Sequence, residues 1–162
     1  MTYELGFKSE FGGSFRLNGA LFRTSYDEMQ LTYRLGIVPL LFNAGESKIE
    51  GAELEFTYAP GALIIEGSLG YLDNEFEEIA QVPGTTQTVG PNNRLPFTPE
   101  VQGNVGMGYD FSVGAGTLTP RLNVSYTDEQ FFDAANSIEV AQLESVTLLN
   151  ASLTWSTDSW KI

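Results

Sequence analysis

Apolar and polar side chains alternate with a period of two over residues 101–111, whose sequence is VQGNVGMGYDF. Val101, Val105 and Phe111 mark one side of this pattern, and Gln102 and Asn104 mark the other. Successive side chains of a β-strand point to opposite faces, so this stretch predicts a strand with one apolar and one polar face. The same alternation recurs along the chain without a sustained helical period, which predicts an all-β protein.

Charge and residue content exclude several functional classes. The 162 residues include 8 basic and 21 acidic side chains, a net charge of -13, so nucleic acid is not an expected partner. The chain contains no Cys and no His, so it lacks thiolate metal ligands and the commonest general base. We therefore predict no catalytic residues, no metal site and no cofactor, and we expect a protein that is not an enzyme.

The pattern allows membrane strands but no membrane helices. The longest nearly continuous apolar run is residues 37–42, which Pro39 interrupts, whereas a spanning helix needs about 20 apolar residues. Membrane strands need only about 9–11 residues each. The apolar faces also end in aromatic side chains, as the lipid-facing bands of membrane barrels do. We expect an outer ring of Tyr3, Tyr71 and Tyr126 and a periplasmic ring of Phe11, Phe15, Tyr58, Tyr109, Phe111 and Trp155.

The alternation divides the chain into about seven long strands joined by connections of alternating length. Tight turns that contain Gly are expected at 11–13, 59–61 and 112–116, and long links at 36–45, 77–96 and 130–144. Short turns at one end and long loops at the other are typical of outer-membrane barrels, whose short turns are periplasmic. The strands are expected at 2–10, 14–35, 43–58, 62–76, 97–111, 117–130 and 145–157.

Residues 21–35 permit two interpretations. Odd positions stay in phase from Phe15 to Leu35, which fits one long strand that rises past the membrane surface. A hairpin that turns at SYDE, residues 25–28, would break the alternation of short and long connections. We predict the single strand. Because a whole single-chain bacterial barrel has an even number of strands, the odd total predicts a partial antiparallel transmembrane β-barrel, a piece of a larger one.

Several segments in order resemble one known family. The most specific are NAG at 43–45 followed by IEGAE at 49–53, and NRLP at 93–96 followed by PE at 99–100. GTLTPRLNVSYTDEQFFDAAN and LLNASLTW follow them along the chain. Together these segments resemble the later barrel strands of TonB-dependent outer-membrane receptors, and the resemblance covers nearly all of residues 1–162.

The resemblance implies a transporter barrel of about 22 strands with a plugged lumen. Its function would be TonB-energised uptake of a scarce solute, most often a ferric siderophore, in the outer membrane of a Gram-negative bacterium. The implied partners are membrane lipid and lipopolysaccharide, a plug domain, TonB and the solute. The plug, the TonB box and the closing strand are not recognised in these residues, so this segment alone is not expected to transport.

Two alternatives remain open at this stage. One is a small porin-like or structural outer-membrane barrel. The other belongs to a different class, a soluble ligand-binding β-barrel whose aromatic side chains fill a core, because soluble sandwiches and barrels show the same alternation. A folded, monodisperse product in plain buffer would favour the soluble alternative.

Candidate functional residues lie on the polar faces and in the long links. The lumen-facing candidates either pair with a plug, line a solute path or simply hydrate the wall; they are Glu53, Glu55, Glu66, Gln102, Asn104, Arg121 and Asn123. Phe131, Phe132 and Asp133 either contact solute at a loop vestibule or pack the loop. The acidic stretches 73–78 and 128–133 lack the spacing of a known calcium loop, so a solvated loop is their expected role.

Overall fold

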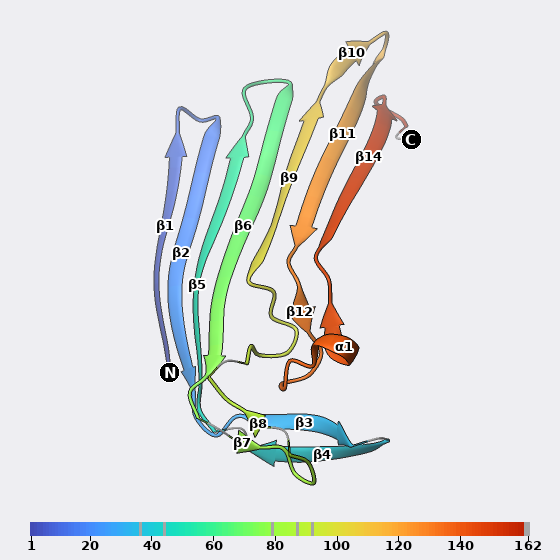
Figure 1. Cartoon of the computed structure of the whole chain (residues 1–162). Coiled ribbons are helices and arrows are strands. Elements are labelled where there is room, and N and C mark those ends of the chain that lie inside the picture. The colour runs from blue at the N-terminus through green and yellow to red at the C-terminus, as the bar shows by residue number, and fades with distance from the viewer. Residues whose placement is uncertain (36, 44, 79, 87, 92, 161–162) are drawn as a thin grey trace.

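The computed structural model describes residues 1–35, 37–43, 45–78, 80–86, 88–91 and 93–160. An open, eight-stranded antiparallel sheet dominates it (Figure 1). Seven long strands are neighbours in the order β1-β2-β5-β6-β9-β11-β14, and the short strand β10 also pairs with β11. This architecture confirms the prediction of an all-β, partial barrel wall. Its long strands are β1 (Thr2–Phe11), β2 (Phe15–Tyr26), β5 (Ser47–Tyr58), β6 (Leu63–Phe76), β9 (Val101–Tyr109), β11 (Gly116–Thr127) and β14 (Val146–Ser156).

Short and long connections occupy opposite ends of the sheet, as predicted. The tight turns after β1 and β5 lie at the upper end in Figure 1, together with β10 (Phe111–Val113), which pairs with the start of β11. The long connections 27–46, 77–100 and 128–145 all lie at the lower end. Gly12, Gly13 and Gly61 have positive φ angles of 57°, 68° and 75°, a region that glycine adopts without steric cost.

The prediction of one strand over 14–35 is wrong. β2 ends at Tyr26, and Glu28 has a φ of 54°, which no strand residue adopts. A separate hairpin follows, in which β3 (Gln30–Leu35) pairs with β4 (Val38–Asn43) and runs across the end of the sheet (Figure 1). The backbone N–H of Met29 donates to the Gly45 carbonyl at 2.8 Å, so the base of this hairpin is closed by its own bond.

Other boundaries also differ from the predicted ones. β5 begins at Ser47 rather than at 43, β9 begins at Val101 rather than at 97, and β11 ends at Thr127 rather than at 130. The residues beyond these ends belong to loops that contain short elements of their own. These are β7 (Ala80–Gln81) with β8 (Thr88–Val89), β12 (Gln130–Phe131) with β13 (Gln142–Leu143), and α1 (Ile138–Ala141).

α1 is a single turn of helix. Among the described residues, no helix has both the length and the apolar character that crossing a membrane would require.

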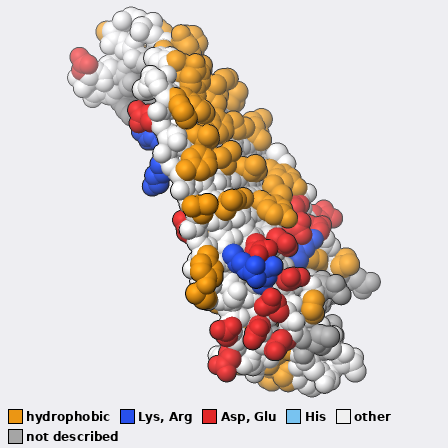
Figure 2. Space-filling view, turned by 90° about the vertical axis from the view of Figure 1, so that its left-hand side faces the viewer, with side chains coloured by type: hydrophobic (Ala, Val, Ile, Leu, Met, Phe, Trp, Pro, Cys, Tyr) orange, Lys and Arg blue, Asp and Glu red, His pale blue; other side chains and the backbone are white. Residues whose placement is uncertain are grey.

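The register of the strands sorts side chains into two faces. Rows of partners cross the sheet, and paired residues point to the same side. Leu5, Leu21, Ala52, Tyr71 and Val101 form one such row, and Phe11, Phe15, Tyr58, Ile65, Met107, Leu122 and Ala151 form another. Figure 2 shows the resulting band of hydrophobic side chains, bordered toward the long-loop end by charged ones.

No part of the described protein covers this apolar face. Leu5 is 75% exposed, Leu69 53% and Leu149 70%, although each lies in the middle of a long strand. Contiguous exposed apolar patches of this kind are rare in soluble monomers and mark contact with a partner or with lipid. The face therefore needs an apolar environment that the described residues do not supply.

The buried core lies elsewhere, at the long-loop end. Phe76, Val82 and Val89 are fully buried there, and Ile49 packs against the same cluster. Ile49 and Phe76 point to the polar side of the sheet, because they alternate with the apolar rows of β5 and β6. The loops thus fold against the end of the polar face; the other members of the core are Phe42, Leu95 and Ala134.

Aromatic side chains gather where the sequence places them. At the tight-turn end, the ring centroids of Phe11 and Phe15 are 5.9 Å apart, and those of Phe15 and Tyr58 are 6.4 Å apart. Tyr109 and Phe111 lie 4.5 Å apart farther along the same edge. Such pairs contribute about 0.5–1.5 kcal/mol beyond their buried area.

Two glycines of β6 provide a test of this packing. A Cβ at Gly67 would lie 2.8 Å from the Asn104 carbonyl oxygen and 2.7 Å from the Phe56 ring, whereas the nearest atom to a Cβ at Gly70 is 3.5 Å away. We expect Gly67→Ala to lower the free energy of unfolding by about 1–3 kcal/mol, because a backbone oxygen cannot move aside. Gly70→Ala, the matched control, should leave the free energy of unfolding unchanged or raise it. Urea titration of the refolded chain in detergent measures both, and equal effects would contradict the packing described.

Candidate functional site

All seven lumen-facing candidates lie on one face of the sheet. Along this face Glu53 aligns with Gln102 across Gly70, and Glu55 aligns with Asn104 across Ser68. Glu66 likewise aligns with Asn123 across Gly106, and Arg121 lies opposite Gly108. The structure therefore brings together, as neighbours in space, side chains that lie on four different strands.

The contacts among these residues are exposed to solvent. The Asn104 amide donates to the Ser68 hydroxyl at 2.6 Å. Arg121 and Glu66 form an ion pair at 3.6 Å in which both side chains are half exposed. Exposed pairs of this kind contribute about 0–1 kcal/mol, so they do not hold the sheet together.

Glu53 and Glu55 are the exception, because neither forms an ion pair with any described residue. They lie two residues apart on β5 and line two shallow hollows of about 480 and 430 Å³. Lys8 and Asn18 contribute to the first hollow, and Gln102 contributes to the second. Two unpaired carboxylates on a polar wall favour a cationic group on whatever lies against them.

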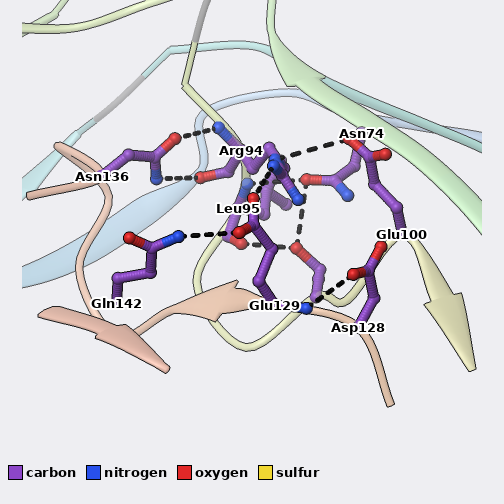
Figure 3. A network of polar contacts seen from close by, with 9 residues as sticks. Asn74, Arg94, Leu95, Glu100, Asp128, Glu129, Asn136 and Gln142 are labelled. Atoms are coloured by element: carbon purple, nitrogen blue, oxygen red, sulfur yellow. Dashed lines mark hydrogen bonds and ion pairs between the residues drawn. The ribbon is translucent and has the colours of Figure 1, made fainter. Parts of the chain in front are cut away.

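The long-loop end contains a second polar group, centred on Arg94 (Figure 3). Its guanidinium forms ion pairs with Glu129 at 2.8 Å and with Glu100 at 3.4 Å. It also lies over the Phe131 ring, 5.5 Å from the centroid, which adds a cation–π contact. Glu129 in turn accepts a hydrogen bond from the Gln142 amide at 2.8 Å, so Arg94 links the loop before β9 to the loop after β11.

Two asparagines complete this connection. The Arg94 N–H donates to Asn136 Oδ1 at 2.6 Å, and Asn136 Nδ2 donates back to the Arg94 carbonyl at 2.9 Å. Asn136 has a φ of 51°, a conformation that Asn tolerates better than most residues. Asn74 Oδ1 accepts from the N–H of Leu95 at 2.6 Å and from the Thr98 hydroxyl at 3.1 Å, and only 5% of Asn74 is exposed.

These contacts give the NRLP segment, residues 93–96, a structural role in anchoring the loops. They also show that two of the three vestibule candidates support the loop and that one is exposed. Phe131 is buried beneath Arg94, and Asp133 Oδ1 accepts the N–H of Ser137 at 3.0 Å, so both support the loop. Phe132 is 48% exposed, and its ring lies 5.5 Å from that of Phe97, which is also exposed. Phe97 was not a candidate from the sequence; its φ of 60°, rare for an aromatic residue, appears only in the folded chain.

The acidic stretches are dispersed rather than clustered. Asp128 accepts hydrogen bonds from the Tyr126 hydroxyl at 3.0 Å and from the Glu129 N–H at 2.9 Å, and Glu129 is paired with Arg94. Asp73 and Glu75 are in phase with Leu69 and Tyr71 along β6, so they point to the apolar side of the sheet. Within the described ranges, no three His, Cys, Asp or Glu residues are grouped so that they would hold a metal ion.

The architecture defines a class of protein: one arc of a large antiparallel β-barrel wall, with one apolar and one polar face and with its described long loops at one end. The whole chain, residues 1–162, matches the family described as TonB dependent receptor-like, beta-barrel. The chain belongs to this family.

Known members are much longer than this chain. The pesticin receptor of Yersinia pestis is 28% identical over 158 residues, which cover 96% of this chain and 22% of that protein. The crystal structure of the ferric yersiniabactin uptake receptor FyuA from Yersinia pestis superposes with a TM-score of 0.74 at 26% identity, covering 95% of this chain and 22% of that one. BauA, the ferric preacinetobactin receptor from Acinetobacter baumannii, gives a TM-score of 0.72 at 25% identity, covering 97% and 22%. The chain therefore spans about a fifth of these relatives.

Asn74 tests whether the polar contacts hold the loops. Asn74→Ala would leave the buried N–H of Leu95 without its acceptor, which costs about 1–3 kcal/mol. We expect faster hydrogen exchange at Leu95 and a loss of stability in that range. Asn104→Ala is the control, because its amide contact is exposed and water replaces the lost bond. Hydrogen exchange read by mass spectrometry distinguishes the two, and equal protection in both variants would contradict this role.

Proposed function

We propose that this chain forms part of the barrel wall of an outer-membrane receptor that takes up a ferric siderophore with energy supplied through TonB. The observation that supports this most strongly is the apolar face of the sheet, which remains exposed across all its long strands while the core lies in the loops. Lipid is the environment that such a face requires. A soluble ligand-binding barrel would bury these side chains in its interior. The membership of the chain in the TonB-dependent receptor family also favours the outer-membrane barrel.

The orientation follows from the two ends of the sheet. The tight turns would face the periplasm and the long loops the exterior of a Gram-negative cell, as in other outer-membrane barrels. The aromatic rows beside the tight turns, with Tyr3 and Tyr71 at the other margin, would then mark the two membrane interfaces. Membrane lipid and lipopolysaccharide are the partners of the outer face in this arrangement.

On the polar face we assign the seven candidates to the lumen wall. The unpaired carboxylates of Glu53 and Glu55 would lie against basic groups of a plug domain, and Glu66, Gln102 and Asn123 would line the hydrated space beside it. We assign a transport role rather than a catalytic one, in agreement with the family of the chain; among the described residues, we find no nucleophile on the polar face that is held by a base and an orienting third group. The plug and TonB act in the longer receptor of which we take this chain to be a segment.

The solute is assigned from the relatives. Two structural relatives are described as receptors for ferric yersiniabactin and ferric preacinetobactin, at 26% and 25% identity. We propose a ferric siderophore for this protein as well. Phe132, together with Phe97, is the described aromatic pair that remains exposed at the long-loop end, so it is our candidate for solute contact.

Spin labels test the environment of the apolar face. Labels at Val105 and Leu122, reconstituted in bilayers, should broaden with oxygen and remain insensitive to a nickel chelate, because oxygen concentrates in hydrocarbon and the chelate stays in water. Labels at Asn104 and Asn123, the neighbouring positions on the polar face, serve as controls and should respond to the chelate. Equal responses at all four positions would refute the lipid-facing assignment.

Iron uptake tests the transport role. Cells whose own receptors are deleted should take up radiolabelled iron, presented as ferric yersiniabactin or ferric preacinetobactin, only when the receptor that carries this chain is expressed. Phe132→Ala should reduce uptake by about tenfold or less at low ligand concentration, since a lost aromatic contact contributes about 0.5–1.5 kcal/mol. Ile138→Ala, at another exposed apolar site in the same loop (72% exposed, against 48% for Phe132), is the control. Uptake that does not depend on the receptor would contradict the proposal.

A further inference from the structure

An apolar groove interrupts the outer face over β1, β2, β5 and β6. It has a volume of about 510 Å³, and its walls include Leu5, Phe7, Leu21, Leu54 and Tyr71. Two small residues explain the depression. Ala52 lies between Leu21 and Tyr71 in the register, and Gly19 has no side chain, so that the Phe7 ring folds over it.

A cation, Arg23, lies one row beyond the residues that line the groove. Arg23 lies on the same face as Leu21, one row nearer the long loops, and its side chain is 56% exposed. Its NH1 contacts Glu50 at 3.2 Å, and the other oxygen of Glu50 contacts Lys48 at 3.0 Å. The remaining donors of the Arg23 guanidinium have no described partner, whereas both oxygens of Glu50 are occupied.

The neighbouring charges limit where an anion would lie. Asp73 and Glu75 are on β6, two strands from β2, which is about 10 Å at the usual strand spacing. On the opposite side of Arg23 the register places Tyr3, which is uncharged. An anion can therefore approach Arg23 from the side of β1, where the nearest described residues on the same face, Tyr3 and Leu5, carry no charge.

We propose that this groove holds one acyl chain of a phosphorylated lipid, whose phosphate contacts Arg23. The inference rests on the proposed lipid-facing role of the apolar face. An apolar groove and, one row beyond it, a guanidinium with free donors match the two parts of such a lipid, because guanidinium donors pair well with phosphate oxygens. A neutral hydrocarbon would use the groove alone, and a soluble anion would use Arg23 alone.

The position of Arg23 supports a headgroup rather than a buried anion. It lies in the row just beyond that of Tyr71, on the side of the long loops. Figure 2 shows charged side chains bordering the hydrophobic band toward that end. Aromatic rings mark the interface between hydrocarbon and headgroups in membrane barrels. A lipid whose chain lies along the groove would thus have its phosphate at the depth of this arginine.

Native mass spectrometry of the full-length protein that carries this chain tests the site. The protein is released from micelles that contain equal amounts of phosphatidic acid and phosphatidylcholine with identical acyl chains. We expect the wild type to retain one phosphatidic acid in preference to phosphatidylcholine. Arg23→Gln should reduce that preference about fivefold, in line with the attraction of one basic residue to an anionic lipid surface. Ala52→Phe should reduce the retention of both lipids by filling the groove.

Two matched variants serve as controls. Arg16→Gln removes an arginine whose side chain is 63% exposed, against 56% for Arg23, and which is paired with Glu10 at 4.0 Å on the polar face. Ala151→Phe adds the same ring to the outer face of β14, away from the groove. Both should retain lipid as the wild type does, and heat-modifiable migration on gels confirms that each variant is folded.

Three outcomes would overturn the proposal: no lipid preference in the wild type, equal effects of Arg23→Gln and Arg16→Gln, or a lipid-free dimer in which a second copy covers the groove. A folded protein that passes the spin-label test but retains no lipid would refute this site alone. A protein that fails the spin-label test would refute the proposed function as well.

Discussion

Each long strand pairs antiparallel with its neighbours, and the register of these pairs determines what every side chain faces. A shift of one residue in any pair would exchange its two faces. Leu21 would then share a face with Glu53 and Glu55, so charged side chains would be mixed into the face that we propose lies against lipid, where charged groups are costly. The unbroken register from β1 to β14 is therefore the condition for an outer face that lipid can cover and an inner face that water can fill.

The long-loop end has a different source of stability. In the described part of the chain, neither face of the middle of the sheet is covered by other elements, and the buried core lies where the loops fold back over Ile49 and Phe76. Arg94, Asn74 and Asn136 join segments that are far apart along the chain by hydrogen bonds to backbone groups. The amide oxygens of Asn74 and Asn136 fix the backbone N–H groups of Leu95 and Arg94 in one geometry, because a displacement would leave those donors unsatisfied. The exposed rings of Phe97 and Phe132 are held on this ordered support.

The sequence predicted most of what depends on a period of two. The strands, the tight turns, the two faces and the seven lumen-facing candidates follow from local alternation, which needs no knowledge of distant partners. The prediction of a single strand over 14–35 failed, because the alternation of side chains continues across residues 27–29 by coincidence although the chain leaves the sheet there. The sequence also placed Phe131 and Phe132 together, although only the fold shows that Arg94 covers the first and leaves the second exposed.

Alternation along the chain was thus sufficient to determine an amphipathic antiparallel sheet, its turns and the chemistry of each face, because neighbouring residues on a strand must point to opposite sides. Only the tertiary structure decided the hairpin β3–β4, the loop core and the partners of Arg94 and Asn74. These features depend on contacts between residues that lie tens of positions apart, as Arg94 and Glu129 do. Such contacts have no period in the sequence, and they form only once the strands have brought the loops to the same end of the sheet.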